Sequence, residues 1–154
     1  MNYKLMWISK IIKYLLCLLI GIAAILPNMV FCDCCEIIII ANKNVPDSSI
    51  SKKHLKDIFL GKKVKWKNDK EIVFVTLSKD DVHDFFLKKY LSKTPSQYSN
   101  YWKTLVFTGK GTLPKSFNNI SALIDFIAKT DGSIGYITSG EALTDVKTLI
   151  ITDE

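Results

Sequence analysis

The feature that most limits what this chain can fold into is its N-terminus, which has the character of an export signal. Three lysines precede an uncharged apolar run at residues 14–26, which ends at Pro27. A basic segment followed by an apolar segment and a break is typical of a secretory signal peptide. The run is shorter than the roughly 20 apolar residues that cross a bilayer, and an uncleaved anchor is the alternative. We therefore expect residues 1–32 to be a signal peptide and residues 33–154 to form the folded domain.

The residues after the apolar run leave two kinds of processing open. Val30 and Cys32 are small enough for the positions that a signal peptidase reads, so the mature chain would begin at Asp33. Lipidation of Cys32, Cys34 or Cys35 is the alternative, although a lipid-modified cysteine normally follows a small residue and these do not. No cysteine follows position 35, so we expect a domain that is not built on disulfides.

Charge and residue usage argue against several functional classes. Residues 33–154 contain 18 lysines against 15 acidic residues, and the whole chain has no arginine. Nucleic-acid readers usually depend on arginine, so with export added we expect no nucleic-acid partner. His54 and His83 are the only histidines, and neither has a second ligand at metal-binding spacing, so we expect no metal and no cofactor. No nucleophile–base or acid–base pair can be assembled, which favours a binding protein over an enzyme.

Apolar runs alternate with amphipathic segments along the rest of the chain. This alternation predicts one α/β lobe, with a central mixed and mostly parallel sheet flanked by helices. Four aromatic residues, Trp66, Tyr101, Trp102 and Phe107, are expected to anchor the core. The predicted strands are residues 36–41, 71–77, 133–137 and 146–152, and the predicted helices run from Ser51 to Gly61, over residues 80–91, from Pro95 onwards, and from Asn118 or Asn119 to Gly132.

Four motifs occur in a recognisable order. They are HLKDIFLGKKVKW at residues 54–66, EIVFVTL at residues 71–77, FTGKG at residues 107–111 and GSIGYI at residues 132–137. Together they resemble the phosphate-type substrate-binding proteins of bacterial ABC transporters, over about residues 36–140. The resemblance implies the type 2 periplasmic-binding-protein fold, a periplasmic or secreted location, and a small anion such as phosphate as ligand.

The chain departs from this family in two ways. Full-length members close two lobes on a ligand, whereas about 120 mature residues suffice for one lobe. Members also carry an arginine and a Ser-Gly-Thr turn between the second strand and the next helix, where free N–H groups hold the anion. The matching residues here are Ser78, Lys79, Asp80, Asp81 and Val82, so two carboxylates stand where the anion would bind. Only the serine and the lysine keep suitable chemistry.

A glycine-rich segment further along the chain is also part of the candidate anion site. Gly109, Lys110 and Gly111 could cradle an anion with backbone N–H groups, or form an ordinary surface loop. We therefore predict a weak anion site made of Ser78, Lys79 and these three residues. The alternative is an envelope protein-interaction module that keeps the fold without a ligand and pairs with another protein or with a second copy. The membrane would be contacted only through the signal segment, if that segment is not removed.

Overall fold

The computed structural model describes residues 36–78, 81–139 and 143–153, which form one compact unit with its own core. The predicted signal peptide and the cysteines around its cleavage point lie outside the described residues. Within the described ranges, no helix combines the length and the apolar character needed to cross a membrane.

A six-stranded mixed sheet forms the centre of this unit, in the order β2-β6-β1-β5-β3-β4. β1 is antiparallel to both of its neighbours, and the other three pairings are parallel. All four predicted strands are confirmed, and two three-residue edge strands join them. The strands are β1 (Ile37–Asn42), β2 (Ser49–Ser51), β3 (Val73–Leu77), β4 (Lys115–Phe117), β5 (Ser133–Thr138) and β6 (Val146–Thr152).

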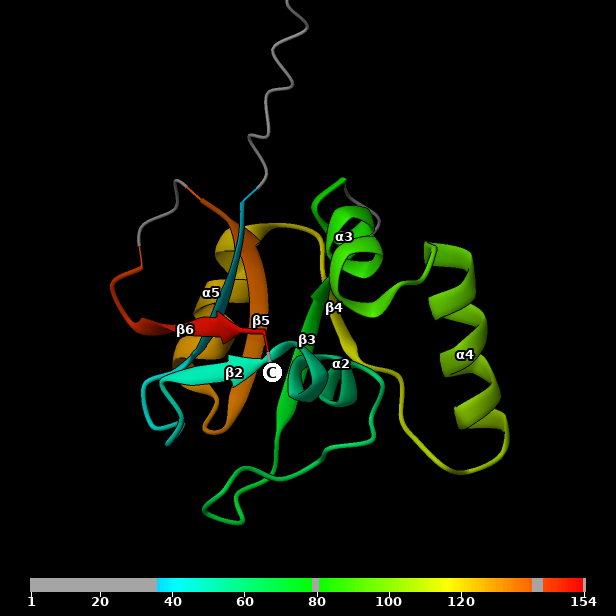
Figure 1. The fold of residues 1–154 in the computed structure, drawn as a ribbon, viewed down its shortest axis with the longest axis horizontal. Helices are drawn as coiled ribbons and strands as arrows, with labels where there is room; N and C mark the ends of the chain where they lie inside the picture. Colours follow the sequence, from blue (N-terminus) through cyan, green and yellow to red (C-terminus); the bar gives the residue numbers. More distant parts are fainter. Residues whose placement is uncertain (1–35, 79–80, 140–142, 154) are drawn as a thin grey trace, which may run out of the picture. The chain divides into compact units, whose positions relative to one another are not determined.

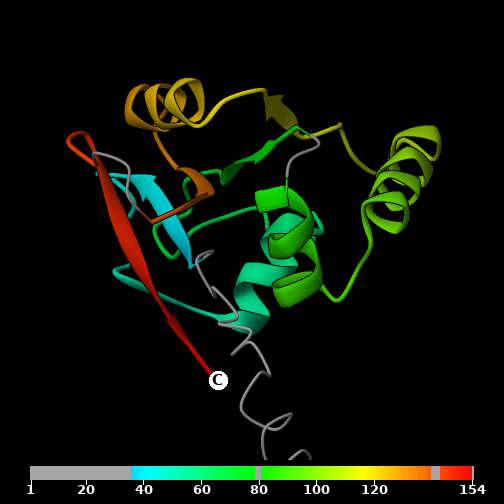
Figure 2. The same cartoon turned by 90° about the horizontal axis from the view of Figure 1, so that it is seen from above.

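Helices cover both faces of the sheet: α5 lies on one face, α2 and α3 lie on the other, and α4 stands to one side (Figures 1 and 2). The predicted caps at Ser51 and Asn119 are confirmed, because each side chain accepts a hydrogen bond from the first turn of its helix. The segment predicted as one helix over residues 80–91 is an α-helix that continues as a π-helix. The helices are α2 (Lys52–Phe59), α3 (Asp81–Phe86), the π-helix η1 (Leu87–Leu91), α4 (Pro95–Phe107) and α5 (Ile120–Lys129).

The GSIGYI motif lies at the centre of the core. The Tyr136 ring stacks on Phe86 with centroids 3.7 Å apart, and Phe59 meets Phe86 edge to face at 4.7 Å. Gly135 allows α5 to pack directly on the sheet, because a Cβ there would lie 2.8 Å from Ile127 Cδ1. These contacts join the two helical layers through β5.

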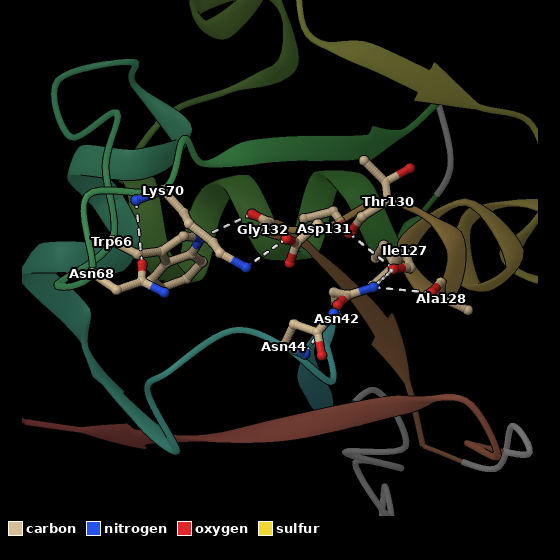
Figure 3. A network of polar contacts seen from close by, with 11 residues as sticks. Asn42, Asn44, Trp66, Asn68, Lys70, Ile127, Ala128, Thr130, Asp131 and Gly132 are labelled. Carbon is tan, nitrogen blue, oxygen red and sulfur yellow. Dashed lines mark hydrogen bonds and ion pairs between the residues drawn. The ribbon is translucent and has the colours of Figure 1, made fainter.

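A polar network holds the turn from α5 into β5 (Figure 3). Asn42 Nδ2 donates to the carbonyl oxygens of Ile127 at 2.8 Å and Ala128 at 2.9 Å. The Trp66 indole N–H donates to the Gly132 carbonyl oxygen at 2.9 Å. The last carbonyls of a helix have no partner within the helix, so the Asn42 amide supplies a donor to the last turn of α5.

One predicted core residue is on the surface. Phe107 was expected to be a core anchor, but 91% of its surface is exposed, whereas Trp66 and Trp102 are buried as predicted. At 100° per residue, position 107 lies about 180° around α4 from the buried Tyr98. The helix face that packs on the domain therefore excludes it.

Candidate functional site

A polar pocket of about 560 Å³ opens where β3 and β4 end and α4 begins. Ligands of open α/β sheets commonly bind outside the carboxyl ends of the strands, which is where this pocket lies. The described lining residues carry hydroxyl, amide, imidazole and ammonium groups, and none of them carries a carboxylate. They are Thr76, Leu77, Ser78, His83, Pro95, Ser96, Tyr98, Ser99, Asn100, Lys103 and Ser116.

The sheet side of the pocket is a group of neighbouring hydroxyls. The parallel register of β3 and β4 pairs Thr76 with Ser116. Thr76 Oγ1 donates to Ser116 Oγ at 3.4 Å, and the Ser116 and Ser78 hydroxyl oxygens lie 3.1 Å apart. Hydroxyls both donate and accept, so this group can rearrange its protons toward a bound anion.

One face of α4 forms the opposite side of the pocket. Ser96, Ser99, Asn100 and Lys103 recur at spacings of three and four residues, which places them on the same side of the helix. Thr94 and Gln97 begin the helix with a capping box that fixes its first turn. Lys103 supplies the only ammonium group among the described lining residues.

Two tyrosines hold α4 in place against the end of α2. Tyr98 donates to the Phe59 carbonyl oxygen at 3.0 Å, and Tyr101 donates to the Leu60 carbonyl oxygen at 2.8 Å. These carbonyls lie at the C-terminal end of α2, where intrahelical partners are lacking. Burial raises the pKa of the Tyr98 hydroxyl far above its usual value, so this donor stays protonated.

His83 forms the buried floor of the pocket. Its Nδ1 lies 2.5 Å from the Tyr136 hydroxyl oxygen, which also accepts a hydrogen bond from the Leu77 backbone N–H at 3.3 Å. The imidazole is 8% exposed and stacks on the Tyr136 ring, with centroids 6.2 Å apart. This contact connects the pocket to the aromatic core.

Of the two residues predicted at positions 78 and 79, the structure places Ser78 at the pocket. Its backbone N–H donates to the Phe117 carbonyl oxygen at 2.7 Å. That N–H group is therefore occupied. Lys79 and Asp80 lie outside the described residues, and α3 begins at Asp81.

The structure does not bring the second predicted segment to the pocket. Gly109, Lys110 and Gly111 follow the far end of α4, whose 13 residues span about 20 Å. Gly109, at φ 67°, donates to Val106 O at 3.0 Å, and Lys110 N donates to Leu105 O at 2.8 Å. This pattern is a Schellman C-cap, so two of the N–H groups expected to cradle an anion close the helix instead.

A mixed sheet with one antiparallel strand, helices on both faces and a polar pocket at the strand ends define one lobe of a periplasmic-binding-protein fold. The chain belongs to the family described as the PBP superfamily domain, which matches it over residues 35–151. No curated protein matches the sequence.

Several solved structures share this fold. A protein described as a phosphate ABC transporter substrate-binding protein, with bound phosphate, from Clostridium perfringens is 18% identical with a TM-score of 0.59, and the match covers 75% of this chain and 44% of that one. An ABC-type phosphate transport receptor from Vibrio cholerae is 16% identical with a TM-score of 0.57, over 75% and 45% of the two chains. PstS from Borrelia burgdorferi is 19% identical with a TM-score of 0.57, over 75% and 46%. The chain thus spans less than half the length of each, which confirms the predicted single-lobe form of this fold.

Proposed function

We propose that residues 33–154 act as a solute-binding module that takes up a small oxyanion, such as phosphate, in the pocket between β3, β4 and α4. The observation that carries this proposal is the lining: hydroxyl, amide and ammonium donors converge at the carboxyl ends of two parallel strands. The Clostridium perfringens protein of similar fold is described with phosphate bound, which supports an anion as the ligand class. The solved structures of similar fold are described as a phosphate transport receptor and a substrate-binding protein, so binding without turnover is the proposed activity.

The affinity should be weak, because one lobe cannot enclose the ligand. Asp81 begins α3 three positions after Ser78, although it is not among the residues that line the pocket. A carboxylate within about 4 Å of a bound anion would repel it by roughly 4 kcal/mol at an effective dielectric near 20. A helix dipole returns only about 0.3–1 kcal/mol at an exposed site. We expect a dissociation constant in the millimolar range.

Calorimetric titration of the protein with inorganic phosphate tests this proposal. Replacing Lys103 with Gln should weaken binding by a factor of about 1.4 to 5, since an exposed charge contributes about 0.2–1 kcal/mol. Lys129→Gln, in the last turn of α5, is the matched control and should leave binding unchanged, because Lys129 does not line the pocket. Micromolar affinity, or equal effects of the two substitutions, would contradict the proposed weak site.

We further propose that residues 1–32 export the domain to the periplasm or the medium and are then removed. The support is the lysine-rich start followed by the apolar run at residues 14–26. N-terminal sequencing of protein recovered from the cell envelope should find a first residue between Asn28 and Glu36. Recovery of an intact Met1 in the membrane fraction would favour an uncleaved anchor.

A second candidate function is an interaction module that pairs with another protein or with a second copy in place of a second lobe. The specific observation in its favour is length, because the match covers only 44–46% of the three solved structures described above. Sedimentation velocity of the purified protein should then show a dimer or a stable complex. A strict monomer that binds phosphate would leave the solute-binding module as the function.

A further inference from the structure

Positive charge is concentrated in two segments of the domain. Residues 85–124 contain six lysines and no acidic residue, and residues 61–67 contain four lysines and no acidic residue. A surface built from these segments presents one sign of charge and attracts anionic partners.

The two segments meet at the buried Trp102. A Cβ on Gly61 would lie 2.8 Å from Trp102 Cη2, and a Cβ on Gly111 would lie 3.2 Å from Trp102 Cζ3. These two indole carbons are bonded to each other. The loop after α2 and the loop after α4 therefore lie side by side at the C-terminal end of α4.

Exposed apolar side chains occur in the same two segments. Phe107 is 91% exposed, Leu113 61%, Val64 58% and Val106 40%. In the described part of the chain only one other large apolar side chain, Ile150, is comparably exposed. We call the following group the α4 tip: Val64, Val106, Phe107 and Leu113, with Lys62, Lys65 and Lys110.

We propose that the α4 tip docks on an anionic phospholipid surface. Phe107 and its apolar neighbours would enter the boundary between headgroups and acyl chains, while the lysines contact the phosphates of the headgroups. Exposed apolar side chains bordered by lysines are the combination that binds such an interface, and lysine stems can lie along apolar surface with the ammonium group in water. Docking would use a surface separate from the polar pocket, since no residue of the tip lines that pocket.

A lipid surface fits the tip better than an acidic protein does. Protein interfaces have a fully buried apolar core depleted of charge, whereas Lys65 directly follows Val64 and Lys110 lies between Phe107 and Leu113. Each lysine close to an anionic membrane strengthens binding about fivefold. Three lysines together give about 100-fold, and raising the salt to about 1 M should remove most of this gain.

Fluorescence quenching by brominated lipids tests the proposal at a single position of the full-length chain. Phe107→Trp places a reporter at the tip, and Ile150→Trp places one at an exposed position of β6, on the far side of β1 and β5 from β3 and β4. The vesicles contain either equal amounts of phosphatidylglycerol and phosphatidylcholine or phosphatidylcholine alone, with brominated acyl chains. The signal is the quenching beyond that of the unsubstituted chain.

We expect the anionic vesicles to quench the tryptophan at position 107. We expect no quenching at position 107 by the zwitterionic vesicles, and none at position 150. Substituting Lys62, Lys65 and Lys110 with Gln in the Phe107→Trp chain should raise the lipid concentration that gives half-maximal quenching about 100-fold. Binding through the N-terminal apolar run alone would not quench position 107 selectively. Absence of quenching at position 107, or equal quenching at both positions or in both vesicles, would overturn the proposal; circular dichroism of each variant confirms that it is folded.

Discussion

Two glycines with the same backbone geometry give a controlled test of how α4 is attached. Gly61 and Gly109 follow the ends of α2 and α4 at φ 68° and 67°. Each donates to a carbonyl three residues back, and the residue after each donates to one five residues back. Their surroundings differ, because a Cβ at Gly61 would lie 2.8 Å from Trp102, whereas a Cβ at Gly109 would have no heavy atom within 4 Å.

Gly109→Ala should therefore report the backbone penalty alone. A left-handed alanine costs about 1–2 kcal/mol, partly offset by about 0.4–1 kcal/mol from the reduced entropy of the unfolded chain, which leaves a loss near 1 kcal/mol. Gly61→Ala adds the displacement of a buried indole, and overpacking of this kind costs roughly 1–3 kcal/mol. Its total loss should be about 2–4 kcal/mol.

Urea unfolding followed by tryptophan fluorescence measures both losses. With a denaturant slope of about 1–3 kcal/mol per molar, the midpoint of Gly61→Ala should lie roughly 1 M below that of Gly109→Ala, with similar slopes. Because Trp102 holds α4 beside the pocket, Gly61→Ala should also weaken phosphate binding. Equal midpoints for the two variants would refute the close contact between Gly61, which follows α2, and the Trp102 ring of α4.

Three further substitutions test other parts of the fold. Asn42→Ala should lower the unfolding free energy by about 1–3 kcal/mol in urea titrations, because the Ala128 carbonyl loses its partner. Tyr98→Phe removes the hydrogen bond to the end of α2 and should cost about 1 kcal/mol by the same assay, while weakening phosphate binding measured by calorimetry. The hydrogen bond and charge of Lys70 hold the pKa of Asp131 below its usual value, so this contribution is present at neutral pH and is lost as the pH falls below about 4. Asp131→Asn should accordingly reduce the small drop in urea midpoint between pH 7 and pH 3 in low salt.

The sequence predicted the parts of the fold that local chemistry determines. The caps at Ser51 and Asn119 were predictable because side-chain acceptors at helix starts act within three residues. The strands β1, β3, β5 and β6 were predictable from their apolar runs. β2 and β4 escaped prediction because a three-residue edge strand such as Ser49–Ser51 carries no periodic pattern.

The candidate site was predictable only in part, because its two sides are distant in sequence. Ser78 came from the family resemblance, but Ser116 is 38 residues away and reaches it only through the parallel pairing of β3 and β4. The polar residues of α4, among them Ser99 and Lys103, recur every three or four positions in the sequence. Nothing local indicates that this side of the helix faces the two strands. The glycines after α4 looked like an anion loop because a helix cap and an anion cradle use the same residue type.

Amide chemical-shift mapping during a phosphate titration tests the central claim most directly, because it locates the site and measures its affinity together. The account predicts saturable shifts at Ser96, Ser99 and Ser116 with a millimolar midpoint, while the amides of Gly109 and Gly111, which do not line the pocket, stay unchanged. Shifts confined to the two glycines, micromolar affinity, or no shift at the three serines would contradict it.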